Sequence, residues 1–578
     1  MSVLERMAEE IATLRRKVAM LETGDRPAPD LVFNVLAFGA DRSGVTETTA
    51  HIQAAMTAAK AAGGGRVYLP AGTYMVAGLT LTDADHIIIC GDGPGRTILR
   101  MKPNTLSAPV LKFVRCNHLT VSDLEIDGDK LHQVSKYIRG IHWLADDAAS
   151  GGVLCEHGTF ERLFIHDTTD QGLIVAGGRW VKLDKIHTER CGSTGNIGAG
   201  IHIVNASPDI SLLSCDVQIS NCSDIGSGLI DGDEGAGLQM QVGTHNIQVS
   251  NYTSWNATKY GIKCQAHQVE LNNIQVFEPG ICGIALQYND VRATNLRVEH
   301  TTSGVVTGIG IGVPQQKTDP RDVRMDLSNI HIVGRGFYNG IEVSNIKSGI
   351  DPAEHVHISN VNIKASVVGG ITTGLHVRGN LKKCSFAHIH ATDCATNISQ
   401  GNYVIDDVVY VPRDITYIDV HSEESLGPGT SGNVGWNCGY GFALLIGCTS
   451  ERLEGSSRVL WQNLNQNWGL ASAQRVGWCG TALDETPVRK ISGDAVAAGR
   501  ASYLELNAES GVTDNLTDLT GGVPGQMVVL RAYYNRTITI VHDSAKIILP
   551  GGVNYTLSGD KRLLLCCIAP GKWTVLNA

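Results

Sequence analysis

A repeat of 22 residues in the middle of the chain constrains the possible folds more than any other feature. Segments 245–266 and 267–288 share few identities, yet each places an asparagine seventh (Asn251 and Asn273) and a Gly-Ile pair at the same later position. The same glycine-aliphatic pattern recurs on both sides of this stretch. A period in the twenties with alternating apolar residues is typical of a solenoid, in which stacked turns share one core. We therefore predict coils of three short strands.

The recurring asparagines are interpreted as structural. One occurs at the same place in successive coils: Asn221, Asn251, Asn273, Asn295, Asn329 and Asn360. Asparagine tolerates the left-handed backbone conformation that a tight corner needs, and stacked amides can hydrogen-bond from coil to coil. We therefore expect an asparagine ladder along one corner.

The composition agrees with a β-rich, turn-rich chain and argues against several functions. Of 578 residues, 66 are glycine and only 18% are charged. The net charge of −10, without a basic stripe, argues against nucleic acid as a partner. No stretch of about eighteen apolar residues occurs, so no membrane insertion is expected. The 15 cysteines follow no disulfide spacing, so free thiols made in a reducing compartment are expected.

Changes of pattern divide the chain into five predicted regions. Residues 1–24 carry two series of apolar residues seven apart, offset by three, which predicts a short coiled-coil helix. Residues 25–30 form a linker, and the repeat occupies residues 31–455. The repeat fades over residues 456–500, a predicted cap or transition region. Residues 501–578 alternate like a small β-sandwich or prism, which we expect to serve trimerisation or carbohydrate binding.

One segment resembles a known family. Residues 33–74, "FNVLAFGADRSGVTETTAHIQAAMTAAKAAGGGRVYLPAGTY", closely resemble the opening segment of pectate-lyase-like right-handed parallel β-helices. The matching parts are "FGAD", the Thr-Ala-x-Ile-Gln helix, "GGG" and "VYLPAGTY". The resemblance implies an all-β fold, a right-handed parallel β-helix. It leaves the activity open, because lyases, hydrolases, epimerases and phage tailspikes share this block.

The leading coiled coil, a charged N-terminus without a secretion signal and the β-rich tail look most like a bacteriophage tailspike or tail-fibre depolymerase. This resemblance implies a homotrimer that is attached to the phage tail or baseplate through its N-terminus. It also implies a location in the virion tail after synthesis in the bacterial cytoplasm. The implied substrate is a bacterial surface polysaccharide: capsule, exopolysaccharide or O-antigen.

Side chains that point outward from the glycine-led strands are the predicted substrate-binding residues. After each glycine the aliphatic residue faces the core and the next residue faces out. Polar residues fill two outward columns over neighbouring coils, namely His202, Gln239 and Lys263 in the first and Gln241, Gln265 and Gln287 in the second, with Tyr260 and Glu278 nearby. Glutamine on three successive coils suits sugar hydroxyls. The alternative is an ordinary solvated sheet face.

Carboxylates in the loops before these strands are the predicted catalytic residues. Asp170 lies in one loop, and Asp231, Asp233 and Glu234 crowd a second loop two coils further on. Glycoside hydrolysis needs one protonated and one charged carboxyl group, and a separation of two coils, about 10 Å, favours inversion. We therefore predict an endo-acting glycoside hydrolase. The "DGDEG" loop lacks the rest of an EF-hand, so neither metal nor cofactor is predicted.

Two other functions stay open. Tyr260 and Lys263 can supply the base and the cation of a polysaccharide lyase, which would cleave a uronic-acid polymer by β-elimination. A non-catalytic host-binding fibre or adhesin would carry the same acids as solvated loop residues or as a calcium site.

Overall fold

The computed structural model describes most of the chain beyond residue 30. The described residues are 31–145, 154–193, 198–206, 214–228, 235–287, 290–302, 306–312, 324–345, 353–367, 370–379, 381–401, 403–405, 408–410, 415–423, 434–438, 442–446, 449–450, 453–454, 458–462, 488–498, 503–522, 524, 526–559 and 561–577. The predicted coiled coil and linker lie outside these residues.

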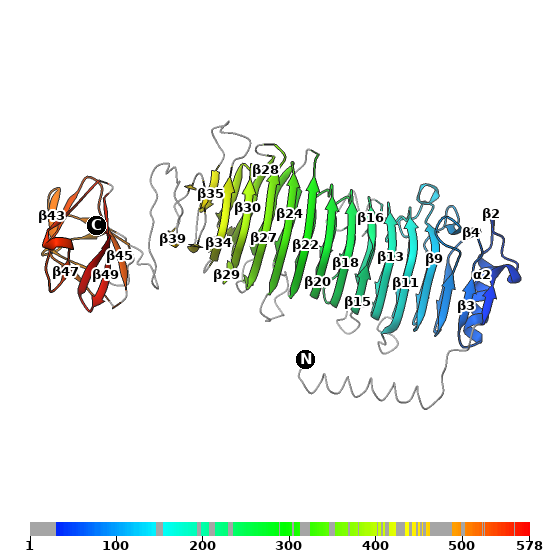
Figure 1. The fold of residues 1–578 in the computed structure, drawn as a ribbon. Coiled ribbons are helices and arrows are strands. Elements are labelled where there is room, and N and C mark those ends of the chain that lie inside the picture. The colour runs from blue at the N-terminus through cyan, green and yellow to red at the C-terminus, as the bar shows by residue number, and fades with distance from the viewer. Residues whose placement is uncertain are drawn as a thin grey trace, which may run out of the picture. The chain divides into compact units, whose positions relative to one another are not determined.

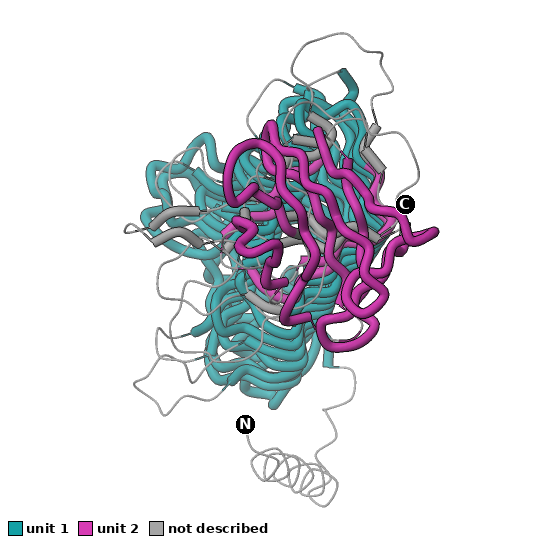
Figure 2. The backbone as a smooth tube through the Cα atoms, turned by 90° about the vertical axis from the view of Figure 1, so that its left-hand side faces the viewer, with its two compact units in different colours: residues 1–376, 391–396, 424–433 teal, residues 377–390, 397–423, 434–578 magenta. Residues whose placement is uncertain are grey.

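Two compact units divide the chain, and Figure 2 colours them. The first comprises residues 1–376 with 391–396 and 424–433, and the second comprises 377–390, 397–423 and 434–578. In the first unit, strands stack side by side as the rungs of a parallel β-helix (Figure 1). The predicted β-helix is therefore confirmed.

Two long parallel sheets form the walls of the first unit. Strands of the first sheet are β1 (Val32–Asn34), β2 (Ser43–Glu47), β3 (Gly65–Tyr68), β4 (Gly72–Val76), β6 (Ile87–Cys90), β7 (Thr97–Met101), β9 (Leu119–Asp127), β11 (Cys155–His166), β13 (Gly178–Glu189), β15 (Cys215–Ser220), β16 (Ser223–Ile225), β18 (His245–Trp255), β20 (His267–Phe277), β22 (Val291–His300), β24 (Met325–Gly334) and β27 (Val356–Ala365). Strands of the second sheet are β5 (Leu79–Thr82), β8 (Pro109–Val114), β10 (Arg139–Leu144), β12 (Leu173–Ala176), β14 (Ala199–Val204), β17 (Ala236–Met240), β19 (Tyr260–Cys264), β21 (Cys282–Leu286), β23 (Val306–Gly312) and β25 (Phe337–Asn345).

Each coil enters the second sheet at a glycine that leaves no room for a side chain. A Cβ at Gly172 would lie 2.6 Å from the carbonyl oxygen of Gly200, and one at Gly237 would lie 2.9 Å from that of Gly261. The same approach of glycine to glycine repeats in every coil from β10 to β25. Steric exclusion at this corner explains why the glycine-aliphatic pattern persists while neighbouring residues change.

The asparagine ladder is confirmed at the corner within the long strands of the first sheet. All six asparagines have φ between 54° and 57°. Asn251 Nδ2 donates to Asn221 Oδ1 at 3.0 Å, and Asn273 Nδ2 donates to Asn251 Oδ1 at 2.8 Å. Asn295 departs from the pattern, because it donates to Asn272 rather than to the corner asparagine, at 3.1 Å. The ladder stabilises the stacking of coils through side-chain hydrogen bonds between successive corners.

Helix α2 (Thr49–Ala61) packs against β1, β3 and β5 at the N-terminal end of the first unit. Its buried stripe consists of Ile52, Ala55, Met56 and Ala59. Two 3-10 helices, η1 (Val35–Phe38) and η2 (Lys130–His132), lie in connections. Because α2 covers the open end of the core, apolar residues of the first coils stay out of water.

Further strands of the repeat type follow β27, at the boundary of the two units and in the second unit. The strands from this part of the chain are β28 (Ile371–Gly379), β29 (Leu381–Lys382), β30 (Ser385–Thr392), β31 (Thr396–Gly401), β32 (Tyr403–Ile405), β33 (Val408–Tyr410), β34 (Ile415–Glu423), β35 (Val434–Cys438), β36 (Phe442–Ile446), β37 (Thr449–Ser450), β38 (Leu453–Glu454) and β39 (Arg458–Gln462). β34 pairs in parallel with β36, and β36 with β39.

A module with its own apolar core ends the chain. Its elements are β40 (Val488–Lys490), β41 (Ala495–Ala497), β42 (Tyr503–Asn507), β43 (Thr513–Leu516), β44 (Asp518–Thr520), β45 (Met527–Ala532), β46 (Thr537–Ile540), β47 (Ile547–Ile548), η4 (Pro550–Gly552), β48 (Tyr555–Ser558), β49 (Arg562–Ala569) and β50 (Lys572–Asn577). The core extends from Ile491 to Trp573. β40 and β41 pair with strands of this module and precede the boundary predicted at residue 501. Within the described residues, no helix has the length and apolarity needed to span a bilayer.

Candidate functional site

The predicted outward column of the glycine-led strands is present in the second sheet. His202 on β14 is the Cα partner of Gln239 on β17, and Gln239 is the partner of Lys263 on β19. The register continues through Ala285 on β21 to Gly310 on β23. Residues on either side of each outward position face the core, as alternation along a strand requires. Three polar side chains from three separate strands thus share one face.

These outward side chains are buried, so this part of the sheet is not the ordinary solvated face that was the alternative interpretation of the sequence. His202 is 3% exposed, Gln239 0% and Lys263 5%. Within the described part of the chain, neither ring nitrogen of His202 and neither amide atom of Gln239 has a hydrogen-bond partner. Leaving a buried polar group unpaired costs about 1–3 kcal/mol. Such an arrangement is expected where a ligand supplies the missing partners.

Cationic groups flank the two unpaired side chains. Burial, followed by repulsion from Arg139 and Lys263, lowers the pKa of His202 to about 3, so this imidazole is neutral at neutral pH. Burial and then Arg139 lower the pKa of His142 to about 3 in the same way. The Lys263 ammonium lies 5.5 Å from the centroid of the Tyr260 ring. Neutral donors and acceptors between cations suit a ligand that brings oxygen atoms or negative charge.

Asp170 lies at the edge of this face, two residues before the corner glycine that precedes β12. Its side chain is 1% exposed, and its Oδ2 accepts a hydrogen bond from Arg139 Nε at 2.8 Å. Oδ1 has no partner among the residues that the structure describes. Burial raises the pKa of Asp170, and the guanidinium of Arg139 opposes this shift. A buried carboxyl group with a raised pKa is what a general acid requires.

Arg139 and His142 also belong to this face. His142 follows Gly140 and Ile141, so the glycine-aliphatic pattern that marks His202 marks it too, whereas no motif marks Arg139. Arg139 directly precedes the corner glycine of β10, and Tyr260 occupies the equivalent place on β19. Arg139 Nε lies 3.2 Å from Gln171 Oε1 in addition to its contact with Asp170. The available signal was a large polar residue just before a corner glycine, where small residues stand on β14 and β17.

The predicted glutamine column is half-buried beside this face. Gln241, Gln265 and Gln287 each directly follow a strand of the second sheet. The backbone N–H of each donates to the coil before it at 2.8–2.9 Å, which leaves the side-chain amides for other contacts. Because the three glutamines are half-buried, each is partly accessible to a ligand that lies along the coils.

Glu278 does not join the column. It follows β20 at a corner with φ of 49°, and its Oε1 accepts a hydrogen bond from the Thr301 N–H at 2.8 Å. Burial acts to raise the pKa of Glu278, but hydrogen bonds from Thr301 outweigh it, so the pKa lies below its usual value. The carboxylate thus holds the segment after β22. The other three predicted catalytic acids, Asp231, Asp233 and Glu234, lie outside the described residues.

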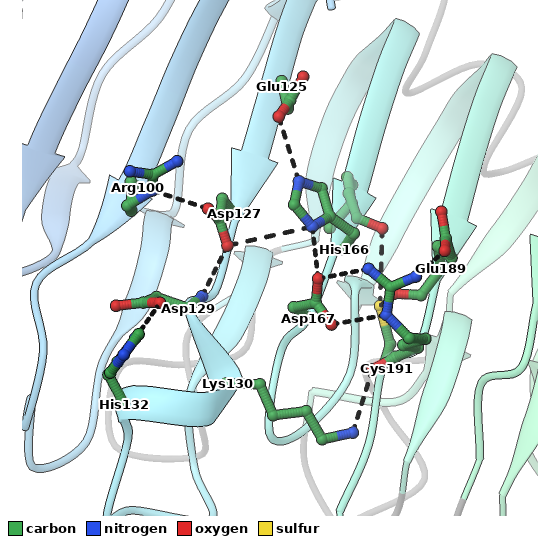
Figure 3. Close-up of polar contacts among 12 residues, drawn as sticks. Arg100, Glu125, Asp127, Asp129, Lys130, His132, His166, Asp167, Glu189 and Cys191 are labelled. Atoms are coloured by element: carbon green, nitrogen blue, oxygen red, sulfur yellow. Dashed lines mark hydrogen bonds and ion pairs between the residues drawn. The ribbon is translucent and has the colours of Figure 1, made fainter. Parts of the chain in front are cut away.

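A second polar cluster lies where β9 and β11 end (Figure 3). Asp127, His166 and Asp167 bring ligand-type atoms within 4.8 Å of one another. His166 lies between two carboxylates, with Nδ1 2.8 Å from Asp167 Oδ2 and Nε2 3.2 Å from Glu125 Oε1. Arginines pair with both aspartates at 2.6–2.8 Å. Because these oxygens already have cationic partners, the cluster is an ion-pair network that ties neighbouring coils together.

Comparison with known proteins agrees with the pectate-lyase-like resemblance. A family model described as Rhamnogalacturonase A/epimerase, pectate lyase-like, matches residues 32–179. The mannuronan C5-epimerase AlgE3 of Azotobacter vinelandii is 41% identical over 110 residues, which are 17% of this chain and 6% of that protein. Among such relatives from this organism, the chain spans no more than 20% of their length.

Phage proteins of known structure have a similar fold. The tailspike protein of Escherichia coli bacteriophage HK620 is 11% identical, with a TM-score of 0.48. The alignment covers 77% of this chain and 78% of that chain. ORF18 of Geobacillus virus E2 is 17% identical, with a TM-score of 0.38. The alignment covers 57% of this chain and 64% of that chain. Similarity at this level concerns the fold, so any chemistry must be argued from the site itself.

Proposed function

We propose that this protein binds and cleaves a bacterial surface polysaccharide on the outer face of β12, β14, β17 and β19. One observation carries the proposal: a buried carboxyl group, Asp170, adjoins two buried side chains, His202 and Gln239, that have no hydrogen-bond partner among the described residues. The half-buried glutamines beside the column offer hydrogen bonds to sugar hydroxyls. A polymer chain that lies along the coils would contact several rungs at once.

The proposed reaction is glycoside hydrolysis. Asp170 acts as the general acid, because burial favours its protonated form. The second carboxylate is proposed to come from Asp231, Asp233 or Glu234, because the repeat in the sequence predicts their loop two coils after that of Asp170. This spacing leaves room for a water molecule and therefore favours inversion. Arg139 positions the Asp170 carboxyl group through Oδ2 and leaves Oδ1 to the glycosidic oxygen.

Abstraction of a proton α to a uronate carboxylate is the second candidate. The specific observation in its favour is the pair of cations, Arg139 and Lys263, on either side of His202. They would neutralise the carboxylate of the sugar, and neutral His202 or the phenolate form of Tyr260 would accept the α-proton as the bond to the glycosidic oxygen breaks. The similarity of part of the chain to mannuronan C5-epimerases supports an acidic sugar as substrate for this route.

A panel of purified capsular polysaccharides and exopolysaccharides tests the proposal and separates the two reactions. New reducing ends without the ultraviolet absorbance of an unsaturated uronate indicate hydrolysis, and both signals together indicate elimination. Binding without either signal indicates an adhesin and overturns the enzymatic proposal. Asp170→Asn is expected to abolish cleavage and retain polymer binding. Lys182→Met, which removes an exposed charge from β13 in the first sheet, is the control that retains both.

We infer further that the enzyme is the tailspike of a phage particle, a homotrimer joined to the tail or baseplate through its N-terminus. The support for this role is the heptad pattern of residues 1–24 together with the β-rich module at the other end. Immunogold labelling of particles from a lysate tests it, because label at the tail is expected and its absence would contradict the assignment.

A further inference from the structure

A pocket of about 570 Å³ opens on the first sheet. Its lining includes Gly95, Arg162, Phe164, Lys185 and His187. Phe164 on β11 is the Cα partner of His187 on β13, so both side chains come from neighbouring strands. The pocket is shallow and open to solvent, so it suits a sugar ring that lies against the surface of the sheet rather than an enclosed small molecule. None of these residues belongs to the face around Asp170, which lies on the second sheet.

Fixed contacts shape the walls of this pocket. Glu125 on β9 is the Cα partner of Phe164, and its Oε2 accepts a hydrogen bond from the Gly95 N–H at 2.8 Å. This bond ties the turn before β7 to the sheet and forms one wall. His187 Nδ1 lies 2.7 Å from Ser223 Oγ, which fixes the orientation of the ring. The pocket is therefore pre-formed, and a ligand does not have to order its walls.

Aromatic carbon forms the floor of the pocket. The Phe164 and His187 rings stack with centroids 5.2 Å apart and planes 22° apart. Burial lowers the pKa of His187, so the imidazole is neutral at neutral pH and adds apolar surface and one polar nitrogen. An apolar floor with a polar rim matches a pyranose ring, which presents C–H groups on its faces and hydroxyls at its edge.

The charges at the rim argue against a strongly anionic ligand. Arg162 donates to Asp123 through Nε at 2.6 Å and through Nη2 at 2.8 Å, and it also pairs with Glu161 at 2.8 Å. Two carboxylates thus engage its guanidinium, and Glu125 brings a further negative charge to the lining. Lys185 contributes an exposed ammonium that can donate to sugar hydroxyls.

We propose that this pocket is a second saccharide-binding site, which takes a neutral hexose unit of a polysaccharide without cleaving it. The site would hold a polymer on the first sheet, whereas the reactive face lies on the second sheet. One polysaccharide chain could then contact two faces of the same coils. Two weak contacts joined by one polymer raise the apparent affinity well above that of either.

Saturation-transfer NMR with glucose, galactose, mannose and N-acetylglucosamine tests the pocket directly. Signal is expected for at least one hexose with the full-length protein. Phe164→Ala is expected to weaken the binding of that hexose by about tenfold or more, as truncation of a central aromatic anchor does. The matched control is Phe277→Ala, because Phe277 is also half-buried, outward and stacked, with Trp255 at 4.0 Å, but lies outside the pocket. Absence of signal, or equal loss in both variants, overturns the inference.

A second pair of variants keeps the test independent of folding defects. His187→Ala removes a pocket residue, whereas His331→Ala removes a histidine from an outward position further along the same sheet. Loss of hexose binding in His187→Ala, with binding retained in His331→Ala, supports the site even if the protein cleaves no polymer. Cleavage of short oligosaccharides by Phe164→Ala at the wild-type rate is expected, and a loss of this activity in proportion to binding would place the pocket in the reactive site and contradict the proposal.

Discussion

His202 and Gln239 lie opposite each other on neighbouring strands, both buried, and neither side chain has a hydrogen-bond partner among the described residues. The pair does not stabilise the folded protein, because each unpaired buried polar group lowers the free energy of unfolding. Natural proteins retain such destabilising groups at functional sites. The pair therefore connects the fold to its proposed use, and its removal should separate stability from binding.

Gln239→Leu should stabilise the protein and impair polymer binding. The substitution removes two unpaired polar atoms at nearly constant volume, so the free energy of unfolding should rise by about 1–2 kcal/mol. Urea denaturation and polymer affinity measure the two effects. Gln275→Leu, a half-buried outward position on β20, is the control that should change neither. Destabilisation by Gln239→Leu would show that the amide has a partner in the folded protein.

Asp224 should make stability depend on pH. Burial raises its pKa from 3.8 to about 6 in the folded state, although Ser227 and Thr188 donate hydrogen bonds to it. A raised carboxyl pKa means that the folded state binds the proton more tightly than the unfolded state. The contribution of Asp224 to the free energy of unfolding is therefore present below about pH 4 and is lost as the pH rises to about 6. The loss above pH 6 corresponds to about 3 kcal/mol. Asp224→Asn should remove this loss, and parallel pH profiles of the two proteins in denaturation experiments would contradict it.

Gly172→Ala should destabilise the β-helix by about 1–3 kcal/mol through overpacking. Its Cβ would meet the Gly200 carbonyl oxygen at 2.6 Å and the Cys191 Sγ at 2.9 Å, and backbone cannot give way cheaply. Gly312→Ala is the matched control on β23, where an added Cβ meets nothing within 4 Å. Thermal unfolding of both variants measures the difference. Equal effects would show that the corner is looser than the contacts indicate.

Two substitutions of Asn251 separate the backbone and side-chain parts of the ladder. Glycine accepts the φ of 54° but removes the hydrogen bonds to Asn221 and from Asn273, whereas alanine removes the bonds and strains the corner. Asn251→Gly should cost about 1 kcal/mol and Asn251→Ala about 1 kcal/mol more. Chemical denaturation gives both values. A smaller cost for alanine than for glycine would rule out the strain.

The full-length chain should be a trimer in solution. Multi-angle light scattering measures the molar mass of the chain, and the same measurement on residues 25–578 shows whether the predicted coiled coil is needed. A trimer that survives the truncation would place the assembly contacts in the β-helix or in the C-terminal module. A monomeric full-length chain would contradict the tailspike assignment.

Much of the fold follows from the sequence, because the corners impose local requirements. The asparagines need a left-handed backbone, and the glycines need to lack a Cβ, so both leave a periodic record. That record also sets the register that places Lys263 beside Gln239. The repeat alone therefore predicts which side chains share a face.

Other features depend on contacts between loops of unequal length, which no period encodes. Asp170 and Glu278 look alike in sequence as acids before a glycine-led strand, yet one faces Arg139 and the other caps a corner. The same reason explains why the burial of His202 and the pocket around Phe164 were not predicted.

The glycine corner has a consequence for how such proteins diversify. Each corner glycine approaches the carbonyl of its successor and side chains of the facing first sheet, so the joint depends on neighbouring coils and not on the total number of coils. Lineages should thus lengthen or shorten by complete coils, and recombination at these joints should produce viable chimaeras. Single-residue insertions at the corners should be selected against, while the loops between strands are free to change in length and sequence.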